Sequence, residues 1–254
     1  MKHSFFPVAV LPFRKSILMF LAMLAFLAAD VDAQSAFDIF EHSSIFLQSE
    51  RVTMQWKMTI HDAQGEKNRE LQVFTTRNKG IDRMLVRITV PASLSGLKIL
   101  RISSVGDASQ TWLKTSRGVR RLAGSSGGEE KLFGSDFTIA DLSAWNGATH
   151  TLERLVEQEA PDTWVIRATG ADDVVRILTI VRESSLVASA KYLGIDGSVV
   201  RSYLVEEWAS TGSDIYPKRV RMTDNMRKTW TVVEVLALNR TTPIPESLFN
   251  PASL

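Results

Sequence analysis

The sequence has 254 residues, 44% of them hydrophobic, and its 30 basic and 28 acidic residues leave a formal net charge of +2. This small basic excess gives no electrostatic basis for neutralising phosphates, so we do not expect nucleic-acid binding. The chain has no cysteine, which excludes disulfides and metal sites built on thiolates.

The N-terminus has the organisation of a secretory signal peptide. Lys2, Arg14 and Lys15 form a basic leader, and a 13-residue apolar run follows from Ile17 to Ala29. This run is shorter than the ~20 apolar residues that a membrane-spanning helix needs. Val31-Asp32-Ala33 then places small residues at the two positions that signal peptidase reads.

Two expectations follow for the organisation of the chain. Residues 1–33 are predicted to be a cleaved signal peptide, and residues 34–254 a single exported domain. Lipid anchoring of an exported protein requires a cysteine next to the cleavage point, and none is present. We therefore expect a soluble, non-lipidated protein in the periplasm.

The exported part is predicted to be almost entirely β. From Arg51 to His61 apolar and polar residues alternate, which places Val52, Met54, Trp56, Met58 and Ile60 on one face of a strand. Similar runs recur every eight to twelve residues with short loops between them, which is typical of an antiparallel all-β domain of roughly eleven to thirteen strands. The further predicted strands are 69–76, 83–90, 97–104, 111–114, 119–122, 151–158, 164–169, 174–182, 186–193, 199–208, 216–223 and 229–238.

Helix is predicted in two places only. Residues 36–47 carry Phe37, Phe40 and Phe46 at a spacing that suits a short helix laid against the sheet. Residues 138–142 suit a single turn, with Thr138 as the N-cap and Asp141 three residues later as the acid of a capping box.

Residues that could carry catalysis or bind a metal are sparse and scattered. His42, His61 and His150 lack the paired spacing of a metal site or of a base beside a nucleophile. The Gly/Ser-rich stretch 124–131 lacks the Gly-Lys-Ser/Thr ending of a phosphate loop. The acid pair 172–173 is better explained as a solvated turn. We therefore expect no enzyme, no metal and no cofactor.

The apolar face of the sheet has two explanations that the sequence alone leaves open. Such a face must be buried against a second layer of protein or against a ligand. Methionine beside tryptophan on one strand suits an ordinary core, and it also suits a cavity that adapts to flexible ligands. Periodicity does not separate these two cases.

An ordered set of short motifs carries a family resemblance. Trp112-Leu113, the basic run 117–122 and the block Leu132-Phe-Gly-Ser-Asp-Phe-Thr138, leading into 139–142, follow one another in the chain. Together with the segment 87–102, Tyr216-Pro217 and the C-terminal 244–254, they resemble the LolA-like family of outer-membrane lipoprotein-sorting proteins. Two departures are Gly96-Leu97-Lys98, where many relatives have Gly-Thr-Gly, and Lys114-Thr115-Ser116, which replaces the usual Tyr-Leu-Pro.

The resemblance implies an incomplete antiparallel β-barrel, a curved sheet around a hydrophobic cavity, with short helices and a loop as a lid. It implies a monomeric periplasmic carrier of lipid or lipoprotein acyl chains, with an inner-membrane transporter as donor and an outer-membrane acceptor as a further expected partner. A 16-carbon chain would be held by ~12 kcal/mol, at ~0.8 kcal/mol per buried methylene, so release requires a handover partner.

The predicted site residues follow from this resemblance together with the strand pattern. One group is expected to line the cavity, and another lies on or under the lid. A basic group is expected to meet anionic head groups or an acidic partner, with a solvated strand face as the alternative. The cavity candidates are Met54, Trp56, Met58, Phe74 and Trp112, the lid candidates are Phe133 and Phe137, and the basic candidates are Arg117, Arg120 and Arg121.

Two alternative functions are carried forward. A non-carrier binding or regulatory module on the same scaffold would dock on an envelope membrane protein and turn over little cargo. A transmembrane barrel also has alternating strands of about ten residues. However, the chain has only three tyrosines and ends in Pro-Ala-Ser-Leu rather than in a strand.

Overall fold

The computed structural model describes residues 34–46, 49–104, 109–122, 130–142, 145, 147–170, 174–212 and 214–254. The chain divides into two units, Met1–Ser35 and Ala36–Leu254. The predicted signal peptide, 1–33, lies outside the described residues. No helix in the described ranges is long and apolar enough to span a membrane. All the strands in these described ranges belong to the second unit.

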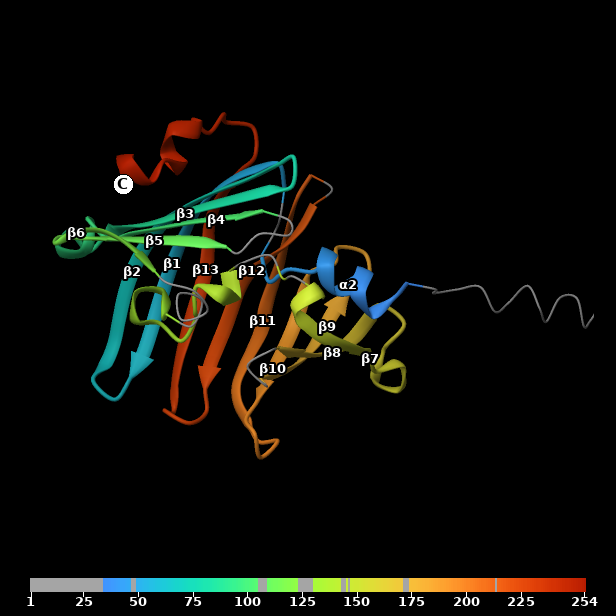
Figure 1. Ribbon diagram of the computed structural model, residues 1–254. Coiled ribbons are helices and arrows are strands. Elements are labelled where there is room, and N and C mark those ends of the chain that lie inside the picture. Colours follow the sequence, from blue (N-terminus) through green and yellow to red (C-terminus); the bar gives the residue numbers. More distant parts are fainter. Residues whose placement is uncertain are drawn as a thin grey trace, which may run out of the picture. The chain divides into compact units, whose positions relative to one another are not determined.

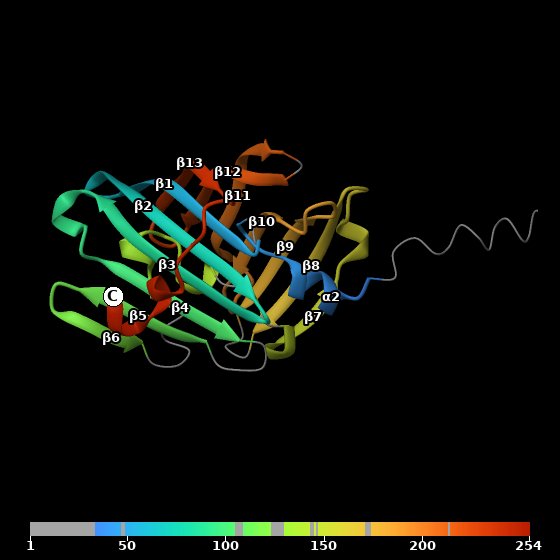
Figure 2. The ribbon, with the colours of Figure 1, turned by 90° about the horizontal axis from the view of Figure 1, so that it is seen from above.

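The second unit is built on one antiparallel sheet of thirteen strands (Figures 1 and 2). The order β6-β5-β4-β3-β2-β1-β13-β12-β11-β10-β9-β8-β7 makes every sheet neighbour a chain neighbour except β1 and β13. The strands are β1 Arg51–Asp62, β2 Gly65–Asn78, β3 Ile81–Val90, β4 Lys98–Ser104, β5 Gln110–Thr115, β6 Gly118–Leu122, β7 His150–Arg154, β8 Thr163–Gly170, β9 Val175–Val181, β10 Val187–Leu193, β11 Val199–Thr211, β12 Asp214–Asp224 and β13 Thr229–Asn239.

This architecture confirms the predicted fold class. The sheet is strongly curved, and its end strands β6 and β7 are not neighbours, so it forms an incomplete barrel. All the predicted strands are present. The predicted strand 151–158 ends early, at Arg154, because Val156–Gln158 turns as a 3-10 helix in which Gln158 N donates to Leu155 O at 2.9 Å.

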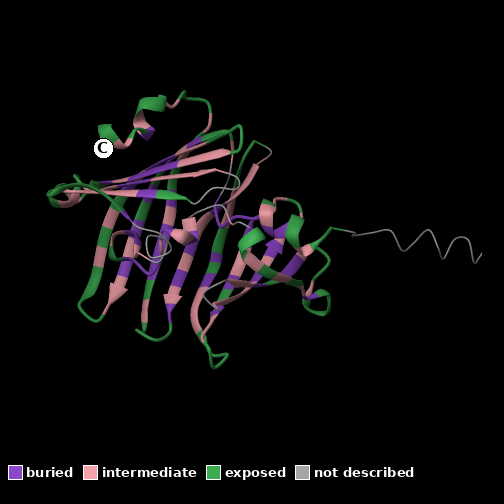
Figure 3. Ribbon diagram, viewed as in Figure 1, coloured by how far each residue is buried: buried purple, intermediate pink, exposed green. Residues whose placement is uncertain are grey.

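The predicted alternation on β1 is confirmed. Val52, Met54, Trp56, Met58 and Ile60 are all at most 3% exposed, while the residues between them are half-buried or exposed (Figure 3). We call the face that carries these five residues the inner face of the sheet, and the opposite one the outer face. Apolar burial on a single strand at period two fixes which way every paired strand must face.

The chain itself covers much of the inner face (Figure 1). Helix α2, Ala36–His42, buries Ile39 and Phe40, and the following residues bury Ile45 and Phe46. A second cover is the stretch 130–142, which buries Leu132, Phe137 and Ile139 and which we call the inner segment. The remaining short helices are η1 Ala92–Leu94, η2 Leu132–Gly134, η3 Ala140–Leu142, η4 Gly147–Thr149, η6 Glu246–Phe249 and η7 Pro251–Ser253.

The two helix predictions have different outcomes. The N-terminal helix ends at His42 rather than at residue 47, because the Ser43 hydroxyl donates to Phe40 O and Ser44 pairs in an extended bridge with Leu186. Residue 47 itself lies outside the described residues. The capping box is confirmed: Thr138 N donates to Asp141 Oδ2 at 2.7 Å, and Asp141 N donates to Thr138 Oγ1 at 3.2 Å.

A smaller apolar cluster lies on the outer face under the C-terminal segment. Phe249, from η6, packs with Phe74, Leu85 and Leu100, and all four are at most 8% exposed. The last turns of the chain therefore cover β2, β3 and β4 from outside (Figure 1).

This cluster generates a stability prediction. We expect Phe249→Ala to lower the free energy of unfolding by about 3–5 kcal/mol, because a fully buried ring is replaced by a cavity. Phe37→Ala is the matched control, since Phe37 is 47% exposed and its truncation is expected to have a much smaller effect. Urea denaturation of both variants measures the difference. If Phe249→Ala lowered the free energy of unfolding no more than the control does, the C-terminal segment would not contribute to the folded domain.

Candidate functional site

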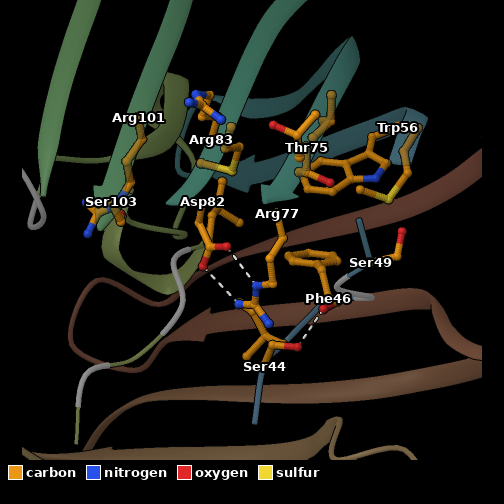
Figure 4. Close-up of a pocket in the computed structure, with 16 residues that line it drawn as sticks. Ser44, Phe46, Ser49, Trp56, Thr75, Arg77, Asp82, Arg83, Arg101 and Ser103 are labelled. Carbon is orange, nitrogen blue, oxygen red and sulfur yellow. Dashed lines mark hydrogen bonds and ion pairs between the residues drawn. The ribbon is translucent and has the colours of Figure 1, made fainter. Parts of the chain in front are cut away.

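A cavity of about 70 Å³ opens on the inner face over strands β1 to β4 (Figure 4). Its floor is Met54 and Trp56 of β1, Val73 of β2 and Met84 of β3, and residues 44–46 form a wall. An engineered apolar cavity of ~150 Å³ holds one benzene molecule. The cavity therefore does not admit a whole acyl chain in this conformation.

Aromatic side chains of the protein fill the space beside the cavity. Phe46 stacks on Trp56 with ring centroids 4.5 Å apart, and Phe137 lies 6.5 Å from Phe46 and 6.4 Å from Tyr203 of β11. Trp56, Phe137 and Tyr203 are each at most 1% exposed. The inner face is thus occupied by protein next to β11, and a small cavity is left next to β1–β4.

Two buried carboxylates pin the inner segment to the sheet. Asp136 is 3% exposed, and its carboxylate accepts hydrogen bonds from Thr229 at 2.6 Å and Thr231 at 2.8 Å, both on β13. Lys131 Nζ lies 3.5 Å from the same carboxylate. Since a buried carboxylate is tolerated only when it is paired and hydrogen-bonded, these contacts fix the segment in one place.

The second pinning acid is Asp141, which is 5% exposed. It accepts from Tyr192 Oη of β10 at 2.8 Å and from Arg201 Nη2 of β11 at 2.5 Å, and Arg201 also donates to Asp136 O. Burial, and next the negative charge of Asp141, raise the pKa of Tyr192, so the tyrosine keeps the proton that it donates. The inner segment is therefore held through β10, β11 and β13.

The predicted inner-face residues have different positions. Met54 and Trp56 line the cavity, whereas Met58 is fully buried in the adjoining core and does not line it. Phe137 is fully buried on the inner segment. Phe133, on the same segment, is partly buried and takes a left-handed backbone conformation, with φ 51°.

Phe74 and Trp112 do not lie on the inner face, and their prediction as cavity residues is wrong. Phe74 pairs with Thr53 and Leu85, and Trp112 pairs with Leu100, so both side chains belong to the outer row. They contact the outer cluster instead. The physical reason is register, because a shift of one position moves a side chain to the other face.

The three predicted basic residues do not converge. Arg120 pairs with Leu113 and Arg121 with Trp112, so they point to opposite faces of β6. Arg120 lies 3.2 Å from Glu130, and Arg121 lies over the Trp112 ring at 5.9 Å. Arg117 is exposed in the β5–β6 turn. A head-group site shared by these three side chains is therefore not formed.

A different arginine, missed by the sequence analysis, lies at the cavity. Arg101 of β4 pairs with Met84, which pairs with Thr75, and all three line the cavity from the inner face. Desolvation lowers the pKa of Arg101 to about 10, so it is still protonated at neutral pH. Its alternation in phase with buried Ile99 was the signal, but a basic residue in a strand is usually solvated.

In the described ranges no three His, Cys, Asp or Glu residues gather as candidate metal ligands. The histidines are far apart in their contacts: His42 bonds to Asp38 O, and His61 stacks on Trp230 with centroids 4.8 Å apart. His150 lies beside Phe40, with ring centroids 5.1 Å apart.

Comparison with known proteins assigns the chain to a protein family. A family model described as "Uncharacterized protein"-like matches residues 80–254. The chain belongs to this family. No curated protein matches the sequence.

Solved structures show the fold of this family member. A DUF1329 family protein from Desulfovibrio piger has a TM-score of 0.72 at 15% identity, over 82% of this chain and 92% of that one. A putative outer membrane lipoprotein-sorting protein domain from Vibrio parahaemolyticus has a TM-score of 0.71 at 17% identity, over 80% and 90%. A LolA superfamily protein from Nitrosomonas europaea has a TM-score of 0.66 at 19% identity, over 88% and 100%.

The chain therefore shares its fold with a LolA superfamily protein and with a putative outer membrane lipoprotein-sorting protein domain, which is the fold that the sequence motifs predicted.

The pinning of the inner segment generates a prediction. We expect Asp141→Asn to lower the free energy of unfolding by about 3 kcal/mol or more, because Arg201 is left without its buried counter-charge. Glu153→Gln, which breaks the exposed pair with Arg167, is the control and is expected to change stability by less than about 1 kcal/mol. Hydrogen exchange of 130–142 should rise only in the Asp141 variant. An unchanged exchange rate would show that Asp141 does not hold the segment.

Proposed function

We propose that this protein is a periplasmic carrier that binds the acyl chains of lipoproteins, or of other lipids, on its inner face and moves them toward the outer membrane. It would be exported by the signal peptide 1–33 and work as a soluble, monomeric, non-lipidated domain from Gln34 onward. One observation carries the proposal: a cavity with an apolar floor of Met54, Trp56, Val73 and Met84 opens on the inner face of a LolA-type sheet.

The size of the cavity means that cargo must displace protein. Phe46 fills the adjoining space through stacking on Trp56, and this side chain forms no bond to either pinning acid. Movement of Phe46 would extend the cavity over the floor of methionines while the inner segment stays bound. Each methylene that enters then contributes ~0.8 kcal/mol. Transfer to and from the cavity would use an inner-membrane transporter as donor and an outer-membrane acceptor.

A second function is favoured by one specific observation. The inner segment is fixed by several hydrogen bonds to β10, β11 and β13, and its own phenylalanine occupies the inner face. A module whose inner face is permanently filled would bind a protein partner rather than lipid. This alternative is a regulatory module that docks on an envelope membrane protein.

The test of the carrier is binding of acyl probes with a matched pair of variants. Thr75→Phe adds a ring inside the cavity, and Thr53→Phe adds the same ring on the outer face of the neighbouring strand. We expect the protein isolated from the periplasm to contain lipid by mass spectrometry. Thr75→Phe should weaken binding of a fluorescent acyl probe at least about tenfold, equivalent to ~1.4 kcal/mol, while Thr53→Phe leaves it unchanged.

Two results would decide against the carrier. Lipid-free protein that also ignores added acyl probes rejects it, since the inner face would then not accept hydrocarbon. Recovery of one stoichiometric protein partner, with no lipid, supports the regulatory module instead. Circular dichroism of both variants checks that each ring is accommodated without loss of the fold.

A further inference from the structure

The cavity holds an unusual share of buried polar atoms that lack a partner. Within the described ranges, five buried side-chain nitrogen or oxygen atoms have no hydrogen-bond partner. Three of them belong to residues that line this one cavity: Trp56 Nε1, Thr75 Oγ1 and Arg101 Nε. Trp56 is only 1% exposed, so water reaches its N–H poorly. Native proteins rarely leave such atoms unpaired, so a cluster of them marks a place where a polar ligand or water would be bound.

The end of the cavity that is formed by Arg77 and Arg101 is positively charged. Arg77 is neutralised by Asp82 through two hydrogen bonds, 2.7 and 2.9 Å long, so this acid is already engaged (Figure 4). Arg101, on the next strand, has no acidic partner in the part of the chain that is described. Burial lowers its pKa, yet at about 10 it remains a cation at neutral pH. A half-buried cation without a counter-charge favours an anionic ligand.

The positive end and the apolar floor of the cavity lie at different positions along the strands. Arg101, Met84 and Thr75 form one row across β4, β3 and β2. This row continues to Val52 on β1, and Val52 lies four residues before Trp56. Four residues of strand correspond to ~13 Å. In Figure 4 Arg101 and Ser103 lie at one end of the cavity, and Trp56 and Phe46 at the other. A ligand that fits has a charged end and a greasy end.

From this arrangement we infer that the cavity binds a single-chain amphiphile with an anionic head group, a carboxylate or a phosphate. The head group accepts hydrogen bonds from Arg101 and Thr75, and the chain lies over Met84 and Met54. This inference rests on the proposed carrier function and narrows its cargo from acyl chains in general to acyl chains with a negative end.

The experiment compares ligands that share one hydrocarbon chain. Hexadecanoate, hexadecyl phosphate and uncharged hexadecanol are titrated against the full domain, with Trp fluorescence as the signal and inorganic phosphate as the chain-free probe. We expect the two anions to bind about 10- to 100-fold more tightly than hexadecanol, as a charge-assisted hydrogen bond predicts. Inorganic phosphate alone should not bind measurably, because the chain supplies most of the affinity.

Arg101→Gln should abolish the preference for the anions while hexadecanol binding stays the same. Arg69→Gln is the matched control. Like Arg101, Arg69 lies on the inner face, here on β2, and it has a buried nitrogen without a hydrogen-bond partner. Burial also lowers its pKa. It does not line the cavity, since its guanidinium lies near Gly134 of the inner segment. The control should keep the full preference. Arg101→Lys should restore part of it.

The outcomes separate this inference from the carrier function. Equal binding of all three chains, or a preference that survives Arg101→Gln, overturns the anionic head-group site and leaves the carrier intact. Tight binding of inorganic phosphate without a chain also overturns it, in favour of a free-anion site. Failure of every chain to bind removes the carrier function itself.

Discussion

Two buried carboxylates decide what occupies the inner face of this sheet. A thirteen-stranded meander that does not close exposes that face to water unless another layer covers it. Here the connection between the two end strands, β6 and β7, includes the inner segment, whose backbone polar groups need partners once they are buried. Asp136 and Asp141 tie the segment to β13, β11 and β10. The room left for a ligand therefore lies on the other half of the sheet, at β1 to β4.

The features that could be predicted from sequence are those set by neighbouring residues. The alternation along β1 is local, because period two follows from strand geometry, and it placed Met54 and Trp56 correctly. The Thr138–Asp141 capping box is local as well, since its two members are three residues apart. The same block carried the resemblance to lipoprotein-sorting proteins, and in the structure it is the part that pins the inner segment. Its motif residues are therefore explained by structure, whatever the cargo.

The features that could not be predicted depend on register and on distant segments. Val73 and Phe74 are adjacent, apolar and both buried, one on each face, and only the pairing of Phe74 with Thr53 assigns it to the outer cluster. Arg101 resembles a solvated strand residue in the sequence. It becomes half-buried because residues 44–46 and Leu142, far away in the chain, form the opposite wall of its cavity. The local pattern contains neither fact.

The inner segment and Phe46 are held on the inner face by contacts of different strength, and this difference determines which of them a ligand would displace. Phe46 is held over Trp56 by stacking and burial, worth together about 2–4.5 kcal/mol, while the inner segment is held by buried charged hydrogen bonds. At ~0.8 kcal/mol for each methylene, three to six methylenes would offset the exposure of Phe46. Breaking the contacts of Asp141 would leave Arg201 as an unpaired buried charge, a loss of about 3–5 kcal/mol. Hydrocarbon would thus enter by displacing one ring beside β1, with the carboxylate contacts of the inner segment unbroken.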